Sequence, residues 1–230
     1  MGPPEDLIVR LARARTIRHF VETGTYRGRT AAWAAEHFPS VWTIEFSREL
    51  YDEARERHRA LENVRFRFGD SRRELERIVG GLDTPALFWL DAHWSGGATY
   101  GAEDQCPLLE EIAIINRSAE ESYILIDDAR LFLSPPQPPH RIAQWPDIAA
   151  VVDALRAGGR EMYIVVIDDV IIAVPAAAKG IVAAYCQEVN AQAWEEYGRQ
   201  QAASGLRRGL QLICRDIRGR LGRLRPGPRK

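Results

Sequence analysis

The sequence predicts an α/β protein with a seven-stranded, mostly parallel sheet that ends in an antiparallel hairpin and carries helices on both faces. Two observations lead to this fold class. Short apolar runs alternate with amphipathic stretches along most of the chain, and only a tight turn at Asp168 and Asp169 separates the last two runs. Alternating strands and helices are typical of βαβ units in a parallel sheet, whereas so short a connection forces two strands to run antiparallel.

The apolar runs are the predicted strands, and the stretches between them are the predicted helices. Ser47 is placed to cap the helix that follows the second run, and Pro107 and Pro146 suit helix starts. The predicted strands are 19–24, 41–45, 64–70, 86–91, 123–128, 162–168 and 170–175. The predicted helices are roughly 4–18, 28–37, 47–61, 71–80, 107–118 and 147–157.

Composition places the chain among soluble globular proteins. Its 230 residues are 46% apolar and 27% charged, and they contain no apolar run long enough for a membrane-spanning helix. The first residues lack the apolar segment of a secretory signal, and the three cysteines form no CxxC pair. We therefore expect a cytoplasmic protein with one domain over 1–175 and a helical extension over 176–230.

Charge is divided unevenly between the body and the carboxyl-terminal segment. The last 25 residues carry a net charge of +8 and the other 205 carry −9, which argues against nucleic-acid binding by the main domain. Apolar residues three or four apart predict a basic amphipathic helix, which we expect to pack on the acidic body or on a second subunit of a homo-oligomer. The alternative partner is an anionic membrane surface. These apolar positions are Leu206, Leu210, Ile213, Ile217, Leu221 and Leu224.

Acidic residues end five consecutive predicted strands. The carboxyl ends of parallel strands meet at one edge of the sheet, and this edge is where open α/β sheets bind ligands. Like charges gathered there destabilise the fold unless a cation or a ligand rich in hydrogen-bond donors is bound. The five strands end at Glu22, Glu45, Asp70, Asp91 and the pair Asp127 and Asp128.

The loop after the first strand favours a cationic nucleoside over a dinucleotide. Tyr26 occupies the position of the second glycine in a pyrophosphate-binding loop, and Glu22 would repel phosphates. Glu45, which lies 21 residues after Gly24, can accept hydrogen bonds from both ribose hydroxyls, and Asp70 can accept one from an adenine amino group. With Glu22 near a ligand ammonium, these requirements describe S-adenosylmethionine.

The motifs ETGTYRGRT, TIE, FGD, LDAHW and ILIDD resemble those of class I S-adenosylmethionine-dependent methyltransferases over about residues 15–175. The resemblance is closest to metal-dependent O-methyltransferases of small molecules, including those acting on macrolide sugars. It implies a Rossmann-like sheet and methyl transfer to a small hydroxylated acceptor. It also implies cofactor contacts at Glu22, Gly24, Thr25, Tyr26, Gly28, Thr30, Glu45, Asp70, Ser71 and Asp91.

The same resemblance implies a divalent metal site at Asp91, Asp127 and Asp128. Three carboxylates on neighbouring strands suit Mg²⁺, which would lower the pKa of a bound hydroxyl. The chain departs from the catechol-type pattern, because Asp128 stands where an amide is common and LDAHWSGG contains no lysine. In the alternative interpretation, Asp91 or Asp127 binds the cofactor amine and Asp128 caps the next segment.

His93 is the candidate general base, with Asp91 as its catalytic neighbour. An unperturbed histidine titrates near neutrality, which suits removal of a proton from a hydroxyl, although a histidine in a loop can also be structural. The loops 94–106 and 131–145 are the predicted walls of the acceptor site. Their aromatic residues Trp94, Tyr100, Phe132 and Trp145 are expected either to hold the acceptor or to pack the loops.

Three other functions remain open at this point. One is an enzyme that uses S-adenosylmethionine for a non-methyl transfer or a cyclisation. Another is an NAD(P)-dependent oxidoreductase, which Glu22 and Tyr26 disfavour. The last is a non-catalytic binding protein that keeps the fold, which the acids after the fourth and fifth strands disfavour.

Overall fold

The computed structural model describes residues 2–94 and 104–223 of the chain, with side chains as far as residue 201. Its packing divides the chain into two compact units, Met1–Val182 and Ala183–Lys230. The predicted domain boundary at residue 175 coincides with the end of the last strand, shortly before this division.

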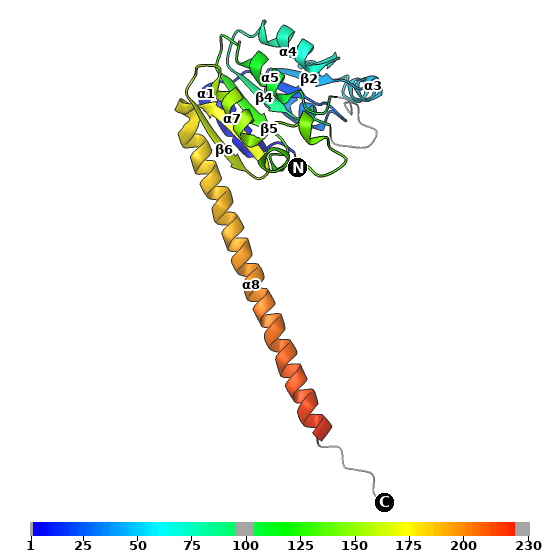
Figure 1. Cartoon of the computed structure of the whole chain (residues 1–230), viewed down its shortest axis with the longest axis vertical. Coiled ribbons are helices and arrows are strands. Elements are labelled where there is room, and N and C mark those ends of the chain that lie inside the picture. The colour runs from blue at the N-terminus through cyan, green and yellow to red at the C-terminus, as the bar shows by residue number, and fades with distance from the viewer. Residues whose placement is uncertain (1, 95–103, 224–230) are drawn as a thin grey trace, which may run out of the picture. The chain divides into compact units, whose positions relative to one another are not determined.

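A seven-stranded sheet forms the first unit, and its strand order is β3-β2-β1-β4-β5-β7-β6 (Figure 1). The first five strands along the chain are parallel, and β7 runs antiparallel to both β5 and β6. All seven predicted strands and the antiparallel hairpin are confirmed. The strands are β1 (His19–Thr23), β2 (Ser40–Glu45), β3 (Val64–Phe68), β4 (Ala86–Leu90), β5 (Ser122–Ile126), β6 (Met162–Ile167) and β7 (Val170–Pro175).

The six predicted helices of this unit are present, each slightly shorter than expected. Ser47 caps its helix as predicted, whereas Pro146 lies one residue before the true cap, Asp147. The helices are α1 (Glu5–Arg15), α2 (Arg29–Ala35), α3 (Arg48–Arg57), α4 (Ser71–Val79), α5 (Leu108–Ile115) and α7 (Ile148–Arg156). Three short elements were not predicted: α6 (Arg130–Leu133), η1 (Ile142–Gln144) and η2 (Ala176–Ala178).

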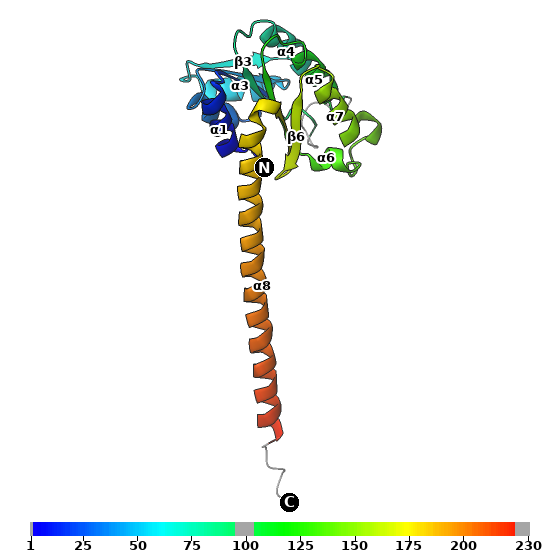
Figure 2. The same cartoon turned by 90° about the vertical axis from the view of Figure 1, so that its left-hand side faces the viewer.

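Helices cover both faces of the sheet, as Figure 2 shows. On one face, Phe20 of β1 packs against Trp33 of α2, with ring centroids 6.2 Å apart. On the other face, its neighbour Val21 joins a buried cluster that includes Leu75 of α4 and Ile112 of α5. Successive residues of β1 therefore point into two different apolar layers, which explains why the strands read as continuous apolar runs.

The β6–β7 hairpin turns at the edge of the sheet where the parallel strands end. Asp168 and Asp169 form the turn with φ of 46° and 64°, the left-handed conformation that a two-residue type I′ turn requires. Because β7 is antiparallel to β5, with Ile171 paired to Ile126, the start of β7 lies beside the carboxyl end of β5. The turn residues are thereby brought close to the acids that follow β5.

Helix α8 (Lys179–Arg223) begins in the first unit and provides the described part of the second. It is one continuous helix of 45 residues, about 67 Å long at 1.5 Å per residue. The sequence predicted helical stretches at 181–203 and 206–224, and the structure joins them through Gly205 without a break. Among the described residues, no helix combines the length and the apolar character needed to cross a membrane.

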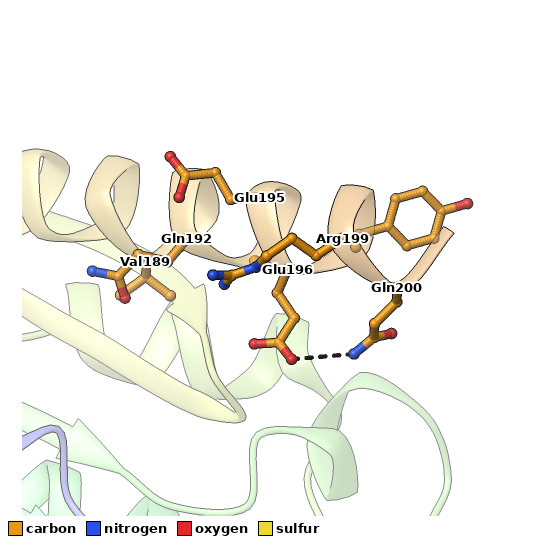
Figure 3. A pocket seen from close by; sticks show the side chains of 8 residues that line it. Val189, Gln192, Glu195, Glu196, Arg199 and Gln200 are labelled. Carbon is orange, nitrogen blue, oxygen red and sulfur yellow. Dashed lines mark hydrogen bonds between the residues drawn. The ribbon is translucent and has the colours of Figure 1, made fainter. Parts of the chain in front are cut away.

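The described side chains of α8 beyond Val189 are exposed to solvent. Trp194 and Tyr197 keep 72% and 53% of their surface, and their rings meet edge to face at 5.8 Å. Figure 3 shows the hollow along this stretch, where Gln200 Nε2 donates a hydrogen bond of 3.2 Å to Glu196 Oε1. Since α8 alone lines this hollow, it is an open helix surface and not an enclosed binding site.

Candidate functional site

The point at which the strand order reverses lies between β1 and β4, and Gly24 occupies it. Gly24 has a φ of 89°, and a Cβ atom there would lie 2.3 Å from the backbone oxygen of Asp91. Asp91 N in turn donates to Thr23 O over 3.0 Å. The glycine is therefore required so that the loops after β1 and β4 can touch, which is how the sheet brings the predicted cofactor and catalytic residues together.

Glu45 fixes the loop after β1 to the end of β2. Its Oε2 accepts a hydrogen bond from Tyr26 N and its Oε1 accepts one from Ser47 N, each of 2.8 Å. Tyr26 adopts a left-handed φ of 48°, and Gly28 begins α2 with a φ of 71°. A carboxylate oxygen has two lone pairs, so Glu45 can hold both amides and still accept hydrogen bonds from a ligand.

Glu22 is buried at the base of the same loop. Its Oε2 accepts a hydrogen bond of 2.5 Å from Thr43 Oγ1, which itself lies 2.6 Å from Thr25 Oγ1. Thr30 forms a further hydrogen bond with the Glu22 carboxyl group. Burial, with smaller contributions from Asp91 and Glu45, raises the pKa of Glu22 to about 8 despite the hydroxyl hydrogen bonds that lower it. A positive ligand group near Glu22 would favour its ionised form.

Asp70 begins α4 and is bound by Arg72. Its Oδ1 accepts hydrogen bonds from Arg72 N and Nε, and its Oδ2 accepts one of 2.7 Å from Nη2. These hydrogen bonds hold the pKa of Asp70 below its usual value. Arg72 is itself held 2.7 Å from Asp104. The role of Asp70 as an adenine acceptor stays a prediction, because the carboxylate already serves as a helix cap and an ion-pair partner.

Ser71 and Glu111 form a buried pair beside this cap. Ser71 is 8% exposed and forms a hydrogen bond with Glu111, which is 1% exposed. Burial raises the pKa of Glu111 to about 7. The sequence gave no indication of this buried acid, because Glu111 looks like an ordinary residue of the first turn of a helix.

His93 and Asp128 form the central pair of the other half of the site. His93 Nε2 lies 2.9 Å from Asp128 Oδ2 and 3.9 Å from Asp91 Oδ1. Burial opposes the charged imidazole, but the hydrogen bond with Asp128 and the nearby acids outweigh it and raise the pKa of His93. The hydrogen bond with His93 and the contact with Arg130 lower the pKa of Asp128 to about 2. Asp128 is therefore ionised near neutral pH.

The predicted metal ligands are neighbours but do not form a metal-binding set. Asp128 directs Oδ2 to His93 and Oδ1 to Arg130 Nη1, 2.7 Å away, and Asp127 Oδ1 accepts a hydrogen bond from Asp128 N. Among the side chains described, those of residues 2–94 and 104–201, no three from histidine, cysteine, aspartate or glutamate are arranged to hold a metal ion. The positive charge beside Asp128 belongs to Arg130, so these carboxylates in their present orientations do not form the expected Mg²⁺ site.

Asp91 keeps 38% of its side chain exposed, more than the neighbouring acids Asp127 and Asp128. Partial burial raises the pKa of Asp91 to about 7, with further contributions from Asp127 and Asp128. The Asp91 side chain retains access to solvent, which screens its charge. Its titration should therefore change the stability of the fold less than that of Glu22, which is 2% exposed.

Aromatic side chains pack around His93. Its ring lies 5.5 Å from that of Trp145 and 6.3 Å from that of Phe132, and His140 lies 5.1 Å from Trp145. Trp94, Phe132 and Trp145 are buried, so the described parts of the predicted acceptor walls pack mainly against one another. Tyr100, another predicted wall residue, lies outside the described residues.

Gln105 is a structural residue of this region that the sequence analysis missed. Its Oε1 accepts hydrogen bonds from Arg141 N, at 2.8 Å, and from Trp145 Nε1, at 3.0 Å. Its backbone oxygen accepts one of 2.8 Å from Trp94 N. One buried amide therefore joins both acceptor-side loops, and no local pattern in the sequence marks it.

Comparison with known proteins identifies the fold that carries this site. No protein-family model matches the sequence, and no curated protein matches it. Solved structures do match: an O-methyltransferase from Bacillus cereus in complex with SAH is 20% identical, with a TM-score of 0.55 over 76% of this chain and 82% of that one. The chain has the class I methyltransferase fold.

Other structures agree with this methyltransferase fold. An SAH-bound methyltransferase from Podospora anserina is 16% identical, with a TM-score of 0.51 over 76% of this chain and 79% of that one. A cofactor-bound protein from MTB is 17% identical, with a TM-score of 0.50 and coverages of 76% and 81%. At these identities the likeness establishes the fold alone.

Proposed function

We propose that this protein is an S-adenosylmethionine-dependent methyltransferase that methylates a hydroxyl group of a small acceptor, such as a sugar or a natural product. One observation carries the proposal. Glu45 is anchored by Tyr26 N and Ser47 N beside the glycine loop at the switch point of the sheet. Each carboxylate oxygen retains a lone pair, so Glu45 can accept both hydroxyls of a ribose.

Residues at the ends of β1 and β2 fit the remaining parts of S-adenosylmethionine. Gly24 keeps the loop free of side-chain atoms where it meets Asp91, and Phe46 exposes 53% of its surface directly after Glu45. Glu22 and Asp91 provide acids near the predicted position of the ligand ammonium. When bound, S-adenosylmethionine supplies an electrophilic methyl group on a sulfonium.

His93 is the base that the arrangement supports. In the proposed reaction, the acceptor oxygen forms a bond to the methyl carbon while the carbon–sulfur bond breaks, and the hydroxyl proton passes to His93. The ionised Asp128 can only accept a hydrogen bond, so His93 Nε2 carries a proton and Nδ1 is the atom free to accept one in the neutral ring. Because its pKa is raised, His93 is a base only above its usual titration range.

Assistance by a divalent metal remains a separate proposal about mechanism. It requires Asp91, Asp127 and Asp128 to turn from their present partners toward one cation. If Asp128 keeps Arg130 and His93 as partners, enzyme treated with EDTA retains full turnover. Loss of turnover with EDTA and its recovery with Mg²⁺ would instead support the metal-assisted reaction.

Product analysis tests the proposed function. The full chain is incubated with S-adenosylmethionine carrying a deuterated methyl group and a panel of phenols, catechols and sugars, followed by mass spectrometry. The labelled methyl group should appear on one acceptor class, with an equal amount of S-adenosylhomocysteine. His93→Ala should lower the single-turnover rate about a hundredfold while calorimetry shows unchanged cofactor affinity.

Other outcomes identify the rival functions. Transfer or cyclisation of another part of the cofactor would replace methyl transfer in the proposal. Binding of NAD(P)H without binding of S-adenosylmethionine would indicate an oxidoreductase. Cofactor binding without turnover of any acceptor, together with an inert His93→Ala substitution, would support a binding protein.

A further inference from the structure

The turn of the β6–β7 hairpin is bonded to the segment that follows β5. Asp169 O accepts a hydrogen bond of 2.8 Å from Ala129 N, and Asp169 Oδ1 accepts one of 2.8 Å from Arg130 N. Asp169 Oδ2 also pairs with Arg130 Nη1. A single turn residue thus holds both the backbone and the side chain of the residues directly after Asp128.

The contacts continue from Arg130 to His93. The same Nη1 atom of Arg130 lies 2.7 Å from Asp128 Oδ1, and Asp128 Oδ2 lies 2.9 Å from His93 Nε2. Asp128 has a φ of 55°, an uncommon backbone conformation for a residue with a side chain, so the surrounding contacts are needed to hold it. Asp169, Arg130, Asp128 and His93 form a continuous series of charged hydrogen bonds.

Turn conformation alone does not explain the carboxylate of Asp169. Asp168 and Asp169 both adopt the left-handed conformation, and asparagine or glycine satisfies a type I′ turn equally well. Asp169 nevertheless places its carboxylate on Arg130, and the antiparallel direction of β7 brings it within reach of that residue. The two neighbouring acids share a conformation, so Asp168 offers a matched control for Asp169.

We propose that Asp169 is a positioning residue for His93, acting through Arg130 and Asp128 to fix the imidazole with Nε2 toward Asp128 and Nδ1 free. The importance of this alignment for catalysis rests on the proposed function. The alignment itself does not, because the orientation and tautomer of the ring can be measured without an acceptor.

Nitrogen-15 NMR of the histidine rings in the full chain tests the proposal. Once the pH is high enough that the ring signals no longer shift, the neutral His93 should show the Nε2–H tautomer in the unmodified protein and in Asp168→Asn. Asp169→Asn and Arg130→Gln should instead show His93 with both tautomers populated. Arg130→Gln is the second variant because its side chain is 59% exposed, so the fold should tolerate the change. His93→Gln assigns the signal, and thermal unfolding checks that each variant is folded.

An unchanged His93 spectrum in folded Asp169→Asn and Arg130→Gln would overturn the proposal. Equal disturbance in Asp168→Asn would also overturn it, since it would show a general effect of the turn. Calorimetry with S-adenosylmethionine runs in parallel and should give the same affinity in all variants. Failure of the unmodified protein to bind the cofactor would reject the proposed function. The tautomer measurement would still decide whether Asp169 positions His93, because it needs neither cofactor nor acceptor.

Discussion

The two halves of the candidate site are held in place in different ways. At the cofactor rim (residues 22–28 and 45–47), Glu45 binds backbone amides only 2 and 19 positions away in the sequence. At the acceptor rim (residues 91–94 and 127–130), side chains bind side chains over 35 positions, for His93 and Asp128, and over 39, for Arg130 and Asp169. Short-range backbone anchoring therefore characterises the proposed cofactor half, and long-range charged contacts characterise the proposed catalytic half.

This difference predicts how the two rims respond to change. Substitutions at the cofactor rim should alter loop position and cofactor affinity, because backbone atoms depend on them. Substitutions at the acceptor rim should alter the orientation of His93 and leave affinity largely unchanged. The experiments below test this division, beginning with the position where the two rims touch.

Gly24→Ala should have the largest effect. Its Cβ would collide with Asp91 O at 2.3 Å in a backbone conformation with a φ of 89°, so we expect a loss of about 4 kcal/mol in the free energy of unfolding. Gly159→Ala is the matched control, because Gly159 has a φ of 73° but no atom near the new Cβ; it should cost about 1 kcal/mol. Urea unfolding measures both. Equal losses would mean that the contact between the rims is not tight.

Glu45→Ala should weaken binding of S-adenosylmethionine with little effect on the chemical step. It removes the proposed ribose acceptor and frees Tyr26 N and Ser47 N, and each hydrogen bond to a charged group is worth about 1.5–3 kcal/mol. Calorimetry measures the affinity, with exposed Glu49→Ala as the control. An unchanged affinity would remove Glu45 from the cofactor site.

The buried acid of the cofactor rim should make stability depend on pH. Glu22 keeps its proton up to about pH 8 in the folded state, whereas an exposed glutamate releases it near 4.5. The free energy of unfolding should therefore fall as the pH rises from about 5 to 8. Asp128 acts in the opposite sense, since its low pKa gives stability above about pH 4 that is lost toward pH 2.

Glu22→Gln should flatten the fall between pH 5 and 8, because the amide resembles the protonated acid and cannot ionise. Exposed Glu36→Gln serves as the control and should leave the pH dependence unchanged. Urea unfolding without cofactor, repeated at each pH, gives the comparison. A pH dependence that survives in Glu22→Gln would assign it to Asp91, Glu111 or His93, whose pKa values are also raised.

Truncation after Ser204 should have the smallest effect on the site. Every residue of both rims precedes the cut, so cofactor affinity and the His93 spectrum should not change. The proposed contact of the basic segment with the acidic body, a second subunit or an anionic membrane predicts a change in oligomeric state or in vesicle binding. Light scattering and flotation with anionic lipid vesicles distinguish these partners. A folded truncated chain that fails to bind the cofactor would contradict the division between body and tail.

The fold and the acids at the sheet edge could be predicted because both follow from local patterns. Buried parallel strands leave continuous apolar runs, and the short connection at Asp168 and Asp169 forces the hairpin. Gly24 and Glu45 could be singled out because a glycine follows the first strand and an acid ends the second strand 21 residues later. The same reasoning placed His93 beside Asp91.

The partners of those acids could not be predicted. The sequence suggests that the carboxylates of Asp70 and Asp128 are available to bind a ligand. In the structure, Arg72 binds Asp70 and Arg130 binds Asp128. Neither arginine differs in pattern from the many others in the chain, and the contact of Arg130 with Asp169 exists only because the sheet folds β7 back beside β5. Gln105 is a similar case, since the partners of its side-chain oxygen, Arg141 and Trp145, lie 36 and 40 positions away.

The exposed indole of Trp194 in α8 gives the protein a fluorescence signal that its composition alone does not reveal. Of the six tryptophans, Trp194 alone is largely open to solvent, and the other five are buried or half-buried in the first unit. A soluble collisional quencher such as iodide should therefore act mainly on the emission of Trp194. Fluorescence can follow events on the helix and in the methyltransferase fold as two separate signals, without any added label.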